Sequence, residues 1–223
     1  MTTHATTHTD AARPDHRGLW HVAEEQGGYF TSAQALTCNI SRRMISHYAR
    51  TGRYAHIRPG LYRLRDFPTS RNEEALAGWL SVGADRAVIS HETALDLYGL
   101  TDIIPNAVHV TVPRSMRWLH APEGVAVHTT VHPPRRDDVT VRDGMRVTSP
   151  ERTLLDVAEL GTAPEQVIVG TRTALAQGLV SAPHILSRAR DRGVRVEHLV
   201  KLALDDAMGA GSDAGVAAQD SHR

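Results

Sequence analysis

The pattern of apolar and polar positions is clearest at residues 40–50, where it follows the period of an α-helix. At about 100° per residue, one half of this helix carries apolar side chains that can pack on a core. These are Ile40, Met44, Ile45, Tyr48 and Ala49. The other half carries side chains of the kinds that contact phosphates and base edges. These are Arg42, Arg43, Ser46, His47 and Arg50. The pattern predicts the recognition helix of a helix-turn-helix.

The segments before this helix predict the first half of such a motif. A first helix is expected at 16–26, and a short strand at 29–30 follows Gly27-Gly28. A second helix is expected at 32–37. The side chains expected to point inward from the two helices are Leu19, Trp20, Val22, Ala23, Ala33, Ala35 and Leu36. Asn39 in the connecting turn tolerates a left-handed backbone, and Ser41 is suited to cap the third helix.

The residues after the third helix predict a wing. The helix is expected to stop at Thr51-Gly52, and two short strands should follow between residues 54 and 62, joined at Pro59-Gly60. Three helices followed by a β-hairpin is the order of a winged helix-turn-helix. We therefore predict such a domain at 16–67, preceded by a disordered tail at 1–15.

A second, mixed α/β domain is predicted at 71–207. The best linker candidate is the segment 67–70, and a disordered tail is expected at 208–223. Helices are expected at 72–82, 91–97, 149–160, 164–178, 182–192 and 195–208. Strands are expected at 87–89, 107–112, 124–130, 139–142 and 145–148, with Asp143-Gly144 as a tight turn. The fold class is therefore α+β, with a helical C-terminal end.

The distribution of charge supports a polyanionic partner for the first domain. The net charge of the chain is zero, but residues 13–65 contain nine arginines and only three acidic residues. The rest of the chain contains 16 basic and 22 acidic residues. A basic module joined to an acidic one indicates a nucleic-acid partner for the basic part.

Other features of composition exclude several classes of protein. No apolar run approaches the roughly 18–20 residues that span a bilayer, and the first residues lack the pattern of a secretory signal. We therefore expect a cytoplasmic protein without a membrane partner. Cys38 is the single cysteine, which excludes an internal disulfide, and its apolar surroundings favour a small core residue.

The candidate DNA contacts are graded along the third helix. Residues early in a recognition helix approach base edges, so Arg42, Arg43 and Ser46 are favoured for base contacts. Arg50 and Arg53 are favoured for phosphate contacts. The candidates that complete this helix are Ser41 and His47. The alternative is a solvated arginine face, which is common on surface helices.

Four further candidates lie outside this helix. Arg58 and Arg63 flank the wing turn, where they either contact the DNA backbone or only solubilise the hairpin. Thr31 and Ser32 stand at the start of the second helix, where backbone N–H groups can bind a phosphate. Capping of the helix explains these two residues equally well.

No catalytic, metal or cofactor site is predicted. Ser90-His91-Glu92 lacks the second histidine of a zinc-binding His-Glu-x-x-His, and Ser90 is better explained as a helix cap. Ser149 lacks the Gly-x-Ser-x-Gly elbow and is expected to cap a helix before Pro150. The histidines show no metal-site spacing, and Asp156 is expected to make an internal hydrogen bond.

Several segments together resemble one known family. They are GGYFTSAQA, the arginine-bearing helix and RYAHIRPGLYRL in the first half, and ISHETALDLYGL, HVTVPR, GVAVH and DGMRVTSPERTLLDVAE in the second. Over roughly residues 17–205 the chain resembles the AbiEi antitoxins and transcriptional regulators of type IV toxin–antitoxin systems.

The resemblance implies a repressor that binds double-stranded DNA at its own promoter. It also implies a second domain that helps to neutralise a nucleotidyltransferase-like toxin, directly or functionally. Because one winged helix buries limited surface, we expect two copies on repeat sites, from a monomer in solution or a weak dimer on DNA. Some relatives continue into a nuclease-like domain, but no Asp…Glu-x-Lys cluster appears here, so no enzyme is expected.

Two alternatives stay open at this point. The basic face can instead bind an acidic toxin, which makes the protein an interaction module without sequence-specific DNA binding. The chain can also be an unrecognised enzyme, for example the remnant of a nuclease-fused relative.

Overall fold

The computed structural model describes the backbone of residues 13–217 and the side chains of residues 13–207. The chain divides into two compact units, Met1–Glu73 and Glu74–Arg223. The division falls a few residues after the linker predicted at 67–70. Most of the tail predicted at 1–15 lies outside the described residues.

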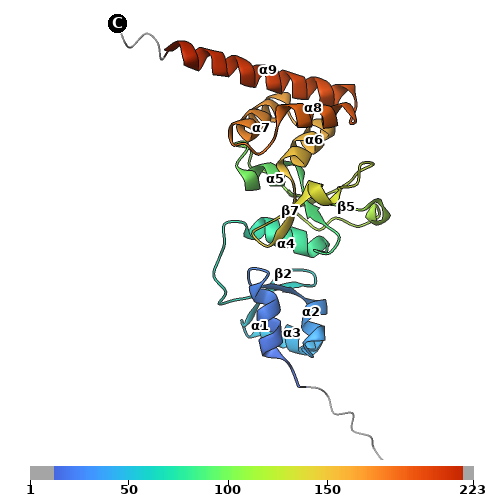
Figure 1. The fold of residues 1–223 in the computed structure, drawn as a ribbon. Helices are drawn as coiled ribbons and strands as arrows, with labels where there is room; N and C mark the ends of the chain where they lie inside the picture. Colours follow the sequence, from blue (N-terminus) through green and yellow to red (C-terminus); the bar gives the residue numbers. More distant parts are fainter. Residues whose placement is uncertain (1–12, 218–223) are drawn as a thin grey trace, which may run out of the picture. The chain divides into compact units, whose positions relative to one another are not determined.

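Unit 1 is built from α1 (His16–Glu24), β1 (Tyr29–Thr31), α2 (Ser32–Thr37), α3 (Arg42–Arg50), β2 (Tyr54–Arg58) and β3 (Leu61–Leu64). The strands form an antiparallel sheet in the order β1-β3-β2. Figure 1 shows α1, α2 and α3 gathered beside this sheet. This is the predicted winged helix-turn-helix arrangement, with the β2–β3 hairpin as the wing.

Local sequence explains where the helices of unit 1 begin. The hydroxyl groups of Thr31 and Ser41 accept hydrogen bonds from the backbone N–H groups three residues later, at the starts of α2 and α3. Asn39 in the turn between these helices has a φ of 56°, in the left-handed region that asparagine tolerates. The Ser41 cap and the Asn39 turn together determine the direction in which α3 leaves α2.

The core of unit 1 lies between the helices and the sheet. Its largest buried side chains are Leu19, Phe30, Ile40, Ile45 and Tyr54. Cys38 is buried here with a free thiol. Three expected core positions are wrong: Trp20 is 45% exposed, and Ala33 and Leu36 are also exposed. Because α1 and α2 are short helices at the surface, each buries only a narrow stripe.

Unit 2 contains a mixed sheet. Its strands are β4 (Val88–Ile89), β5 (Val108–Val112), β6 (Val125–Thr129), β7 (Val139–Arg142) and β8 (Met145–Thr148), in the order β6-β5-β4-β8-β7. The β5–β6 and β4–β8 pairs are parallel, and the other neighbours are antiparallel. Because β6 and β7 lie at opposite edges, the segment 130–138 must cross the whole sheet.

Helices cover this sheet. They are α4 (Glu73–Val82), α5 (His91–Tyr98), α6 (Pro150–Leu160), α7 (Pro164–Ala176), α8 (Ala182–Arg190) and α9 (Val194–Ala217). Figure 1 shows the sheet between α4 on one side and the layer that contains α6–α9 on the other. Gly78 of α4 lies so close to Val108 of β5 that an added Cβ would be 2.7 Å from the valine side chain.

The C-terminal end of the chain is helical, as predicted, but the last helix is longer than expected. We expected it to end near residue 208 and to be followed by a disordered tail. Instead, the backbone of α9 stays helical to Ala217, and residues 218–223 lie outside the described residues. The Gly-rich composition after residue 208 therefore did not locate the end of this helix.

Candidate nucleic-acid interface

The exposed face of α3 carries the predicted recognition residues. Ile45 is 1% exposed and anchors the helix in the core of unit 1, while Met44 and Tyr48 are half-buried against the same core. All five polar candidates on the helix are exposed. These are Arg42, Arg43, Ser46, His47 and Arg50. The packing of one half of α3 therefore presents the other half as a continuous polar surface.

The cations of this face are not neutralised within the described part of the chain. Among residues 13–207, the side chains of Arg42, Arg43 and Arg50 form no ion pair. Arg42 and Arg43 also lie in the first turn of α3, which contains no acidic residue. A helix macrodipole disfavours cations at this end, so both arginines stand where they reduce the stability of the helix. Such a position is typical of residues kept for binding.

Arg53 extends the cationic surface beyond the end of α3. It is exposed, and its guanidinium carbon lies 5.0 Å from the centre of the Tyr48 ring. Stacking on the tyrosine orients the guanidinium without neutralising it. Arg53 therefore fits the phosphate contact that the sequence predicts.

In the wing, Arg63 does not fit the sequence-based prediction. Its side chain is buried, with 8% of the residue exposed. The guanidinium donates hydrogen bonds to the carbonyl groups of Phe67 and Pro68 and to the carboxylate of Glu73, at 2.8–2.9 Å and 2.7 Å. Arg63 therefore closes the end of unit 1 and is unavailable to DNA. The hairpin pattern did not indicate this, because β3 pairs on both sides and turns this side chain inward.

Arg58 is the remaining cation of the wing. It is half-buried, and one terminal nitrogen of its guanidinium is buried without a hydrogen-bond acceptor among the described residues. The positive charge of Arg58 also lies near Tyr29, whose pKa is raised mainly by burial. Arg58 keeps its place among the DNA-contact candidates.

The start of α2 is not arranged for phosphate binding. The backbone N–H of Thr31 donates to the side chain of Gln34 at 2.8 Å, and that of Ser32 donates to the carbonyl of Gly60 at 2.8 Å. Thr31 and Gln34 form a capping box. Both N–H groups thus have internal acceptors, so the capping interpretation holds for Thr31 and the phosphate interpretation holds for neither residue.

In unit 2, Ser90 precedes α5 but its hydroxyl does not cap the helix. Instead, the Ser90 Oγ accepts a hydrogen bond from Thr111 Oγ1 at 2.8 Å and lies 2.8 Å from Nδ1 of His91. The capping role expected of Ser90 is therefore wrong. Because Ser90 is completely buried, its hydroxyl is not an accessible nucleophile either.

Three histidines from separate segments meet beside Ser90. The rings of His91 and His128 have centroids 4.0 Å apart, and Nε2 of His128 lies 3.0 Å from Nδ1 of His109. Burial is the main cause that lowers the pKa of His91 to about 2 and that of His128 to about 4, and it also lowers the pKa of His109. His91 has a φ of 52°, a strained value for a residue other than glycine. No sequence pattern indicated this cluster, because its members lie far apart in the chain.

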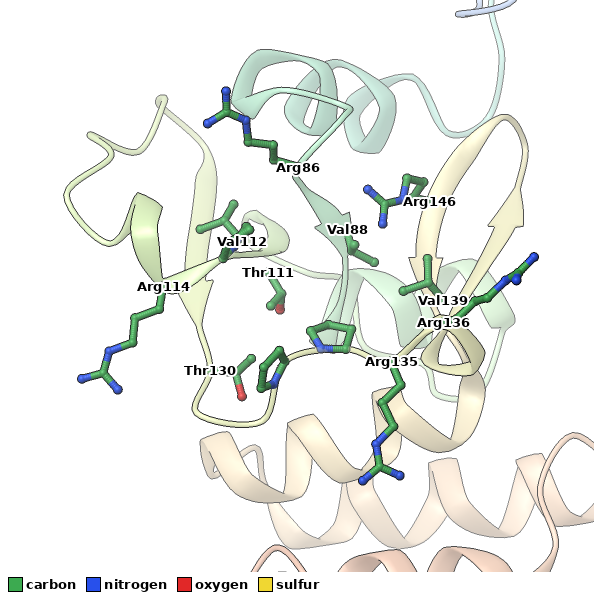
Figure 2. Close-up of a pocket in the computed structure, with 13 residues that line it drawn as sticks. Arg86, Val88, Thr111, Val112, Arg114, Thr130, Arg135, Arg136, Val139 and Arg146 are labelled. Atoms are coloured by element: carbon green, nitrogen blue, oxygen red, sulfur yellow. The ribbon is translucent and has the colours of Figure 1, made fainter.

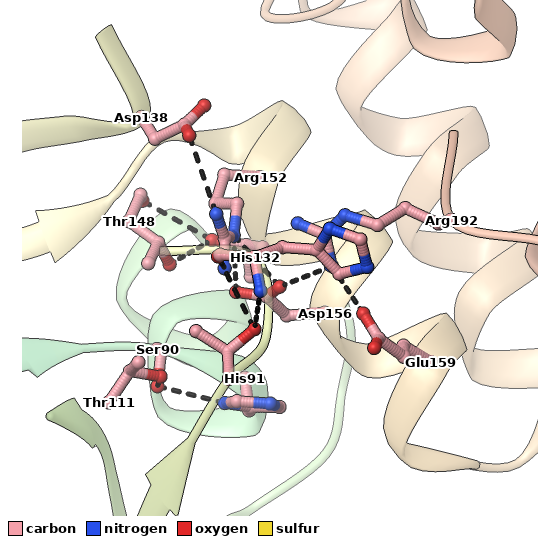
Figure 3. A network of polar contacts seen from close by, with 12 residues as sticks. Ser90, His91, Thr111, His132, Asp138, Thr148, Arg152, Asp156, Glu159 and Arg192 are labelled. Atoms are coloured by element: carbon pink, nitrogen blue, oxygen red, sulfur yellow. Dashed lines mark hydrogen bonds and ion pairs between the residues drawn. The ribbon is translucent and has the colours of Figure 1, made fainter. Parts of the chain in front are cut away.

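A buried ionic network lies beside His91 (Figure 3). Arg152 is 1% exposed; its Nε lies 2.8 Å from both carboxylate oxygens of Asp156, and its other nitrogens contact Asp138 and the carbonyl of His132. Arg192 also contacts Asp156. The network ties the crossover segment 130–138 to α6, and it confirms the internal hydrogen bond predicted for Asp156.

The pKa values of two carboxylates in this network, Asp156 and Asp138, are shifted in opposite directions. Burial raises the pKa of Asp156 despite its arginine partners. Burial also acts to raise the pKa of Asp138, but hydrogen bonds from the Arg135 backbone and from Arg188 outweigh it and lower the pKa. Ser149 caps α6 through a hydrogen bond from the Arg152 backbone, as predicted. These groups hold the crossover segment, α6 and α8 together.

Among the described residues, no group of three or more histidine, cysteine, aspartate or glutamate residues is arranged to hold a metal ion. No helix in this part of the chain has the length and apolar character needed to cross a membrane.

The structure is a mixed α+β fold that begins with three helices and a β-hairpin. A family model described as "Transcriptional regulator, AbiEi antitoxin" matches residues 21–65, and one described as "AbiEi antitoxin C-terminal domain" matches residues 86–176. Together they cover more than half of the chain. The chain therefore belongs to the AbiEi antitoxin family, as the sequence motifs predicted.

A solved structure supports the fold. The crystal structure of the RV2827C protein from Mycobacterium tuberculosis is similar to this chain with a TM-score of 0.58 at 14% sequence identity. The similarity covers 84% of this chain and 74% of that one. No curated protein matches the sequence.

Proposed function

We propose that this protein represses its own operon by binding double-stranded DNA through unit 1. The observation that carries the proposal is the exposed, unpaired cationic face of α3 on a helix anchored by Ile45. Arg42, Arg43 and Ser46 near the start of α3 would enter the major groove, where an arginine can contact guanine with two hydrogen bonds. Ser41 would serve as the cap that orients the helix.

Phosphate contacts would supply most of the affinity. Arg50, Arg53 and Arg58 surround the end of α3 and the wing, and His47 lies on the same face as Arg50. Neutralised phosphates release counterions, so binding should weaken steeply as salt is added. Two copies on repeated sites would supply the surface that a single winged helix lacks.

A gel-shift series with the DNA upstream of the gene tests the repressor role. Replacing both Arg42 and Arg43 by Ala should weaken binding by at least tenfold at moderate salt, because each lost base contact is worth about 1–3 kcal/mol. The matched control is Arg17→Ala with Arg71→Ala, which removes two exposed charges of unit 1 outside α3 and the wing. An equal loss in both double variants would mean that only overall charge matters, and unchanged binding in the first would refute the recognition-helix assignment.

The antitoxin role rests on membership of the family and on unit 2. We propose that unit 2 counteracts a nucleotidyltransferase-like toxin encoded next to this gene, in a protein without enzymatic activity of its own. Co-expression with that neighbour tests the idea: the full chain and the Arg42→Ala, Arg43→Ala variant should both restore growth. Loss of rescue in the variant would show that neutralisation depends on DNA binding, and no rescue by either would refute the role.

One alternative has an observation in its favour. The unpaired arginines of α3 fit an acidic protein surface as well as a phosphate backbone, so unit 1 can bind a toxin in place of DNA. A pull-down of the neighbouring gene product with the full chain separates toxin binding from DNA binding. It compares the unchanged chain with the Arg42→Ala, Arg43→Ala variant. A nuclease activity is tested by incubating the purified protein and plasmid DNA with magnesium, and cleavage would contradict the proposal of a non-enzyme.

A further inference from the structure

A pocket in unit 2 is lined by arginines that have few acidic residues near them. It has a volume of about 550 Å³ and lies between the sheet and the crossover segment 130–138. Five arginines line it, and no acidic residue does. They are Arg86, Arg114, Arg135, Arg136 and Arg146. This is a local excess of positive charge in the half of the chain where acidic residues outnumber basic ones.

The internal contacts of these arginines are few. Arg86 pairs with Asp85 at 3.3 Å, and Arg146 donates to the backbone carbonyl of Asp85 at 2.9 Å. The guanidinium groups of Arg114, Arg135 and Arg136 form no ion pair among residues 13–207. The fold therefore does not use three of these cations, in contrast to the fully paired Arg152.

The placement of these charges indicates the shape of a ligand. Figure 2 shows Arg86, Arg114, Arg135 and Arg136 on different sides of the pocket, with their guanidinium groups pointing in different directions. A single small anion cannot contact all of them. The sites match a chain that carries several spaced charges, and the arginine fork suits phosphate groups.

The interior of the pocket is apolar, whereas its rim is charged. Val88 and Val112 from the sheet and Val139 at the start of β7 line it, together with prolines of the adjoining segments. The volume lies in the range of sites for small organic molecules. A nucleotide base can place its flat apolar faces here while its phosphate stays at the arginine rim.

An exposed aromatic side chain lies on the loop that continues from this rim. Trp118 is 82% exposed and follows Arg114 in the segment between β5 and β6. The guanidinium carbon of Arg117 lies 5.0 Å from the centre of its ring. An exposed tryptophan beside arginines is the combination by which proteins stack bases of single strands while contacting their phosphates.

We infer that unit 2 binds a single-stranded segment of nucleic acid, with one base in the pocket, phosphates on the arginine rim and another base stacked on Trp118. A duplex does not fit this arrangement, because its base faces are stacked on each other and cannot reach a tryptophan or a pocket of this size. The site is separate from α3, and its occupancy does not depend on operator binding by unit 1.

Fluorescence anisotropy with labelled oligonucleotides tests this inference. The full chain carries Arg42→Ala and Arg43→Ala throughout, which weakens the contribution of α3 to binding. The probes are a single-stranded RNA, a DNA of the same sequence, the corresponding DNA duplex, and AMP as a competitor. We expect binding of a single strand that is tighter than binding of the duplex. A preference for RNA or for DNA identifies the source of the strand, and displacement by AMP alone identifies a free nucleotide as the ligand.

Two variants connect the binding to the named residues. Trp118→Ala should weaken single-strand binding by roughly 5- to 150-fold, the range for loss of one stacked base. Arg114→Ala with Arg136→Ala should reduce the slope of log K against log[salt] by about 1.4, or about 0.7 for each phosphate contact with a single strand. The matched control is Arg172→Ala with Arg195→Ala, which removes two exposed cations of unit 2 outside the pocket.

Three results would overturn the inference. They are the absence of single-strand binding at low salt, equal losses in the control and pocket variants, and displacement of the strand by an acidic peptide as readily as by an unlabelled strand. Because the substituted side chains are exposed, folding should be unchanged, and circular dichroism verifies this for each variant. Trp118→Ala in a chain with an unchanged α3 should still bind the operator. This result would distinguish failure of the single-strand inference from failure of the repressor proposal.

Discussion

The arginines of α3 and the arginines around Asp156 have opposite surroundings. Arg42, Arg43 and Arg50 are exposed and form no ion pair among the described residues, whereas Arg152 is buried and contacts two carboxylates. The first group remains available for a partner and adds little to the stability of the fold. The second group is fully used by the fold, because a buried guanidinium must be neutralised where it stands. The same residue type is thus exposed and unpaired among the described residues in one group, and buried and neutralised in the other.

The largest expected effect comes from breaking the buried group. Arg152→Met should destabilise unit 2 by about 3–5 kcal/mol, because it leaves Asp156 and Asp138 buried with one cation fewer. Chemical denaturation measures the change. Arg50→Met should change stability by less than about 0.5 kcal/mol, as expected for an exposed surface residue. Similar losses in the two variants would mean that the contrast between the groups is not energetic.

The second effect concerns the histidine cluster beside this network. In the unfolded chain the pKa of His91 is about 6.5, and burial lowers it to about 2 in the folded state. Below pH 6.5 the unfolded state therefore binds more protons, and stability should fall as the pH decreases. For His91 alone the loss at pH 5 is about 2 kcal/mol.

Denaturation at pH 7 and pH 5 measures this loss. His91→Gln should reduce the pH dependence, while the exposed His198→Gln should leave it unchanged. Stability that does not differ between the two pH values would contradict the neutral state assigned to the cluster.

The third effect separates Arg63 from the other arginines of unit 1. Arg63→Ala removes hydrogen bonds to two backbone carbonyls and to Glu73, so it should lower the stability of unit 1 by about 1–3 kcal/mol. Thermal unfolding measures the loss. At a temperature where the variant is folded, its operator affinity should equal that of the unchanged protein. A large loss of operator affinity without a loss of stability would show that Arg63 contacts DNA.

The smallest expected effect has the opposite sign. Arg42→Glu places a carboxylate in the first turn of α3, where it interacts favourably with the helix dipole, and should stabilise unit 1 by about 0.3–1 kcal/mol. The same change should abolish operator binding. Thermal unfolding and a gel shift together measure the two effects. A variant that is less stable would show that Arg42 supports the fold in the same way as Arg63.

Sequence reasoning was most accurate where local rules decide the structure. The bounds of α2 and the position of the β2–β3 turn followed from Thr31, Asn39 and Pro59-Gly60, because caps and turns act over a few residues. The two faces of α3 followed from the helical period alone. The strands and helices of unit 2 were also located to within a few residues, except for the end of α9.

The errors share a physical cause. Arg63 has the sequence context of an exposed wing cation, but β3 pairs with β1, and the guanidinium lies 5.5 Å from the ring centre of Tyr29 on that strand. Ser90 has the context of a cap, but Thr111 on the neighbouring strand competes for its hydroxyl. In both cases one of the partners, Tyr29 for Arg63 and Thr111 for Ser90, is distant in the chain and adjacent only in the folded protein.

The amino-acid sequence by itself determined the two-domain plan, the amphipathic α3 helix and the family, because each depends on periodicity, capping or short motifs. The tertiary structure decided which polar groups remain free. It enclosed Arg63 and Arg152 and brought His91, His109 and His128 together. Among the described residues, it left the arginines of α3 and three of the five pocket arginines of unit 2 without an ion pair. Burial and charge neutralisation depend on contacts between distant segments, and no local pattern contains that information.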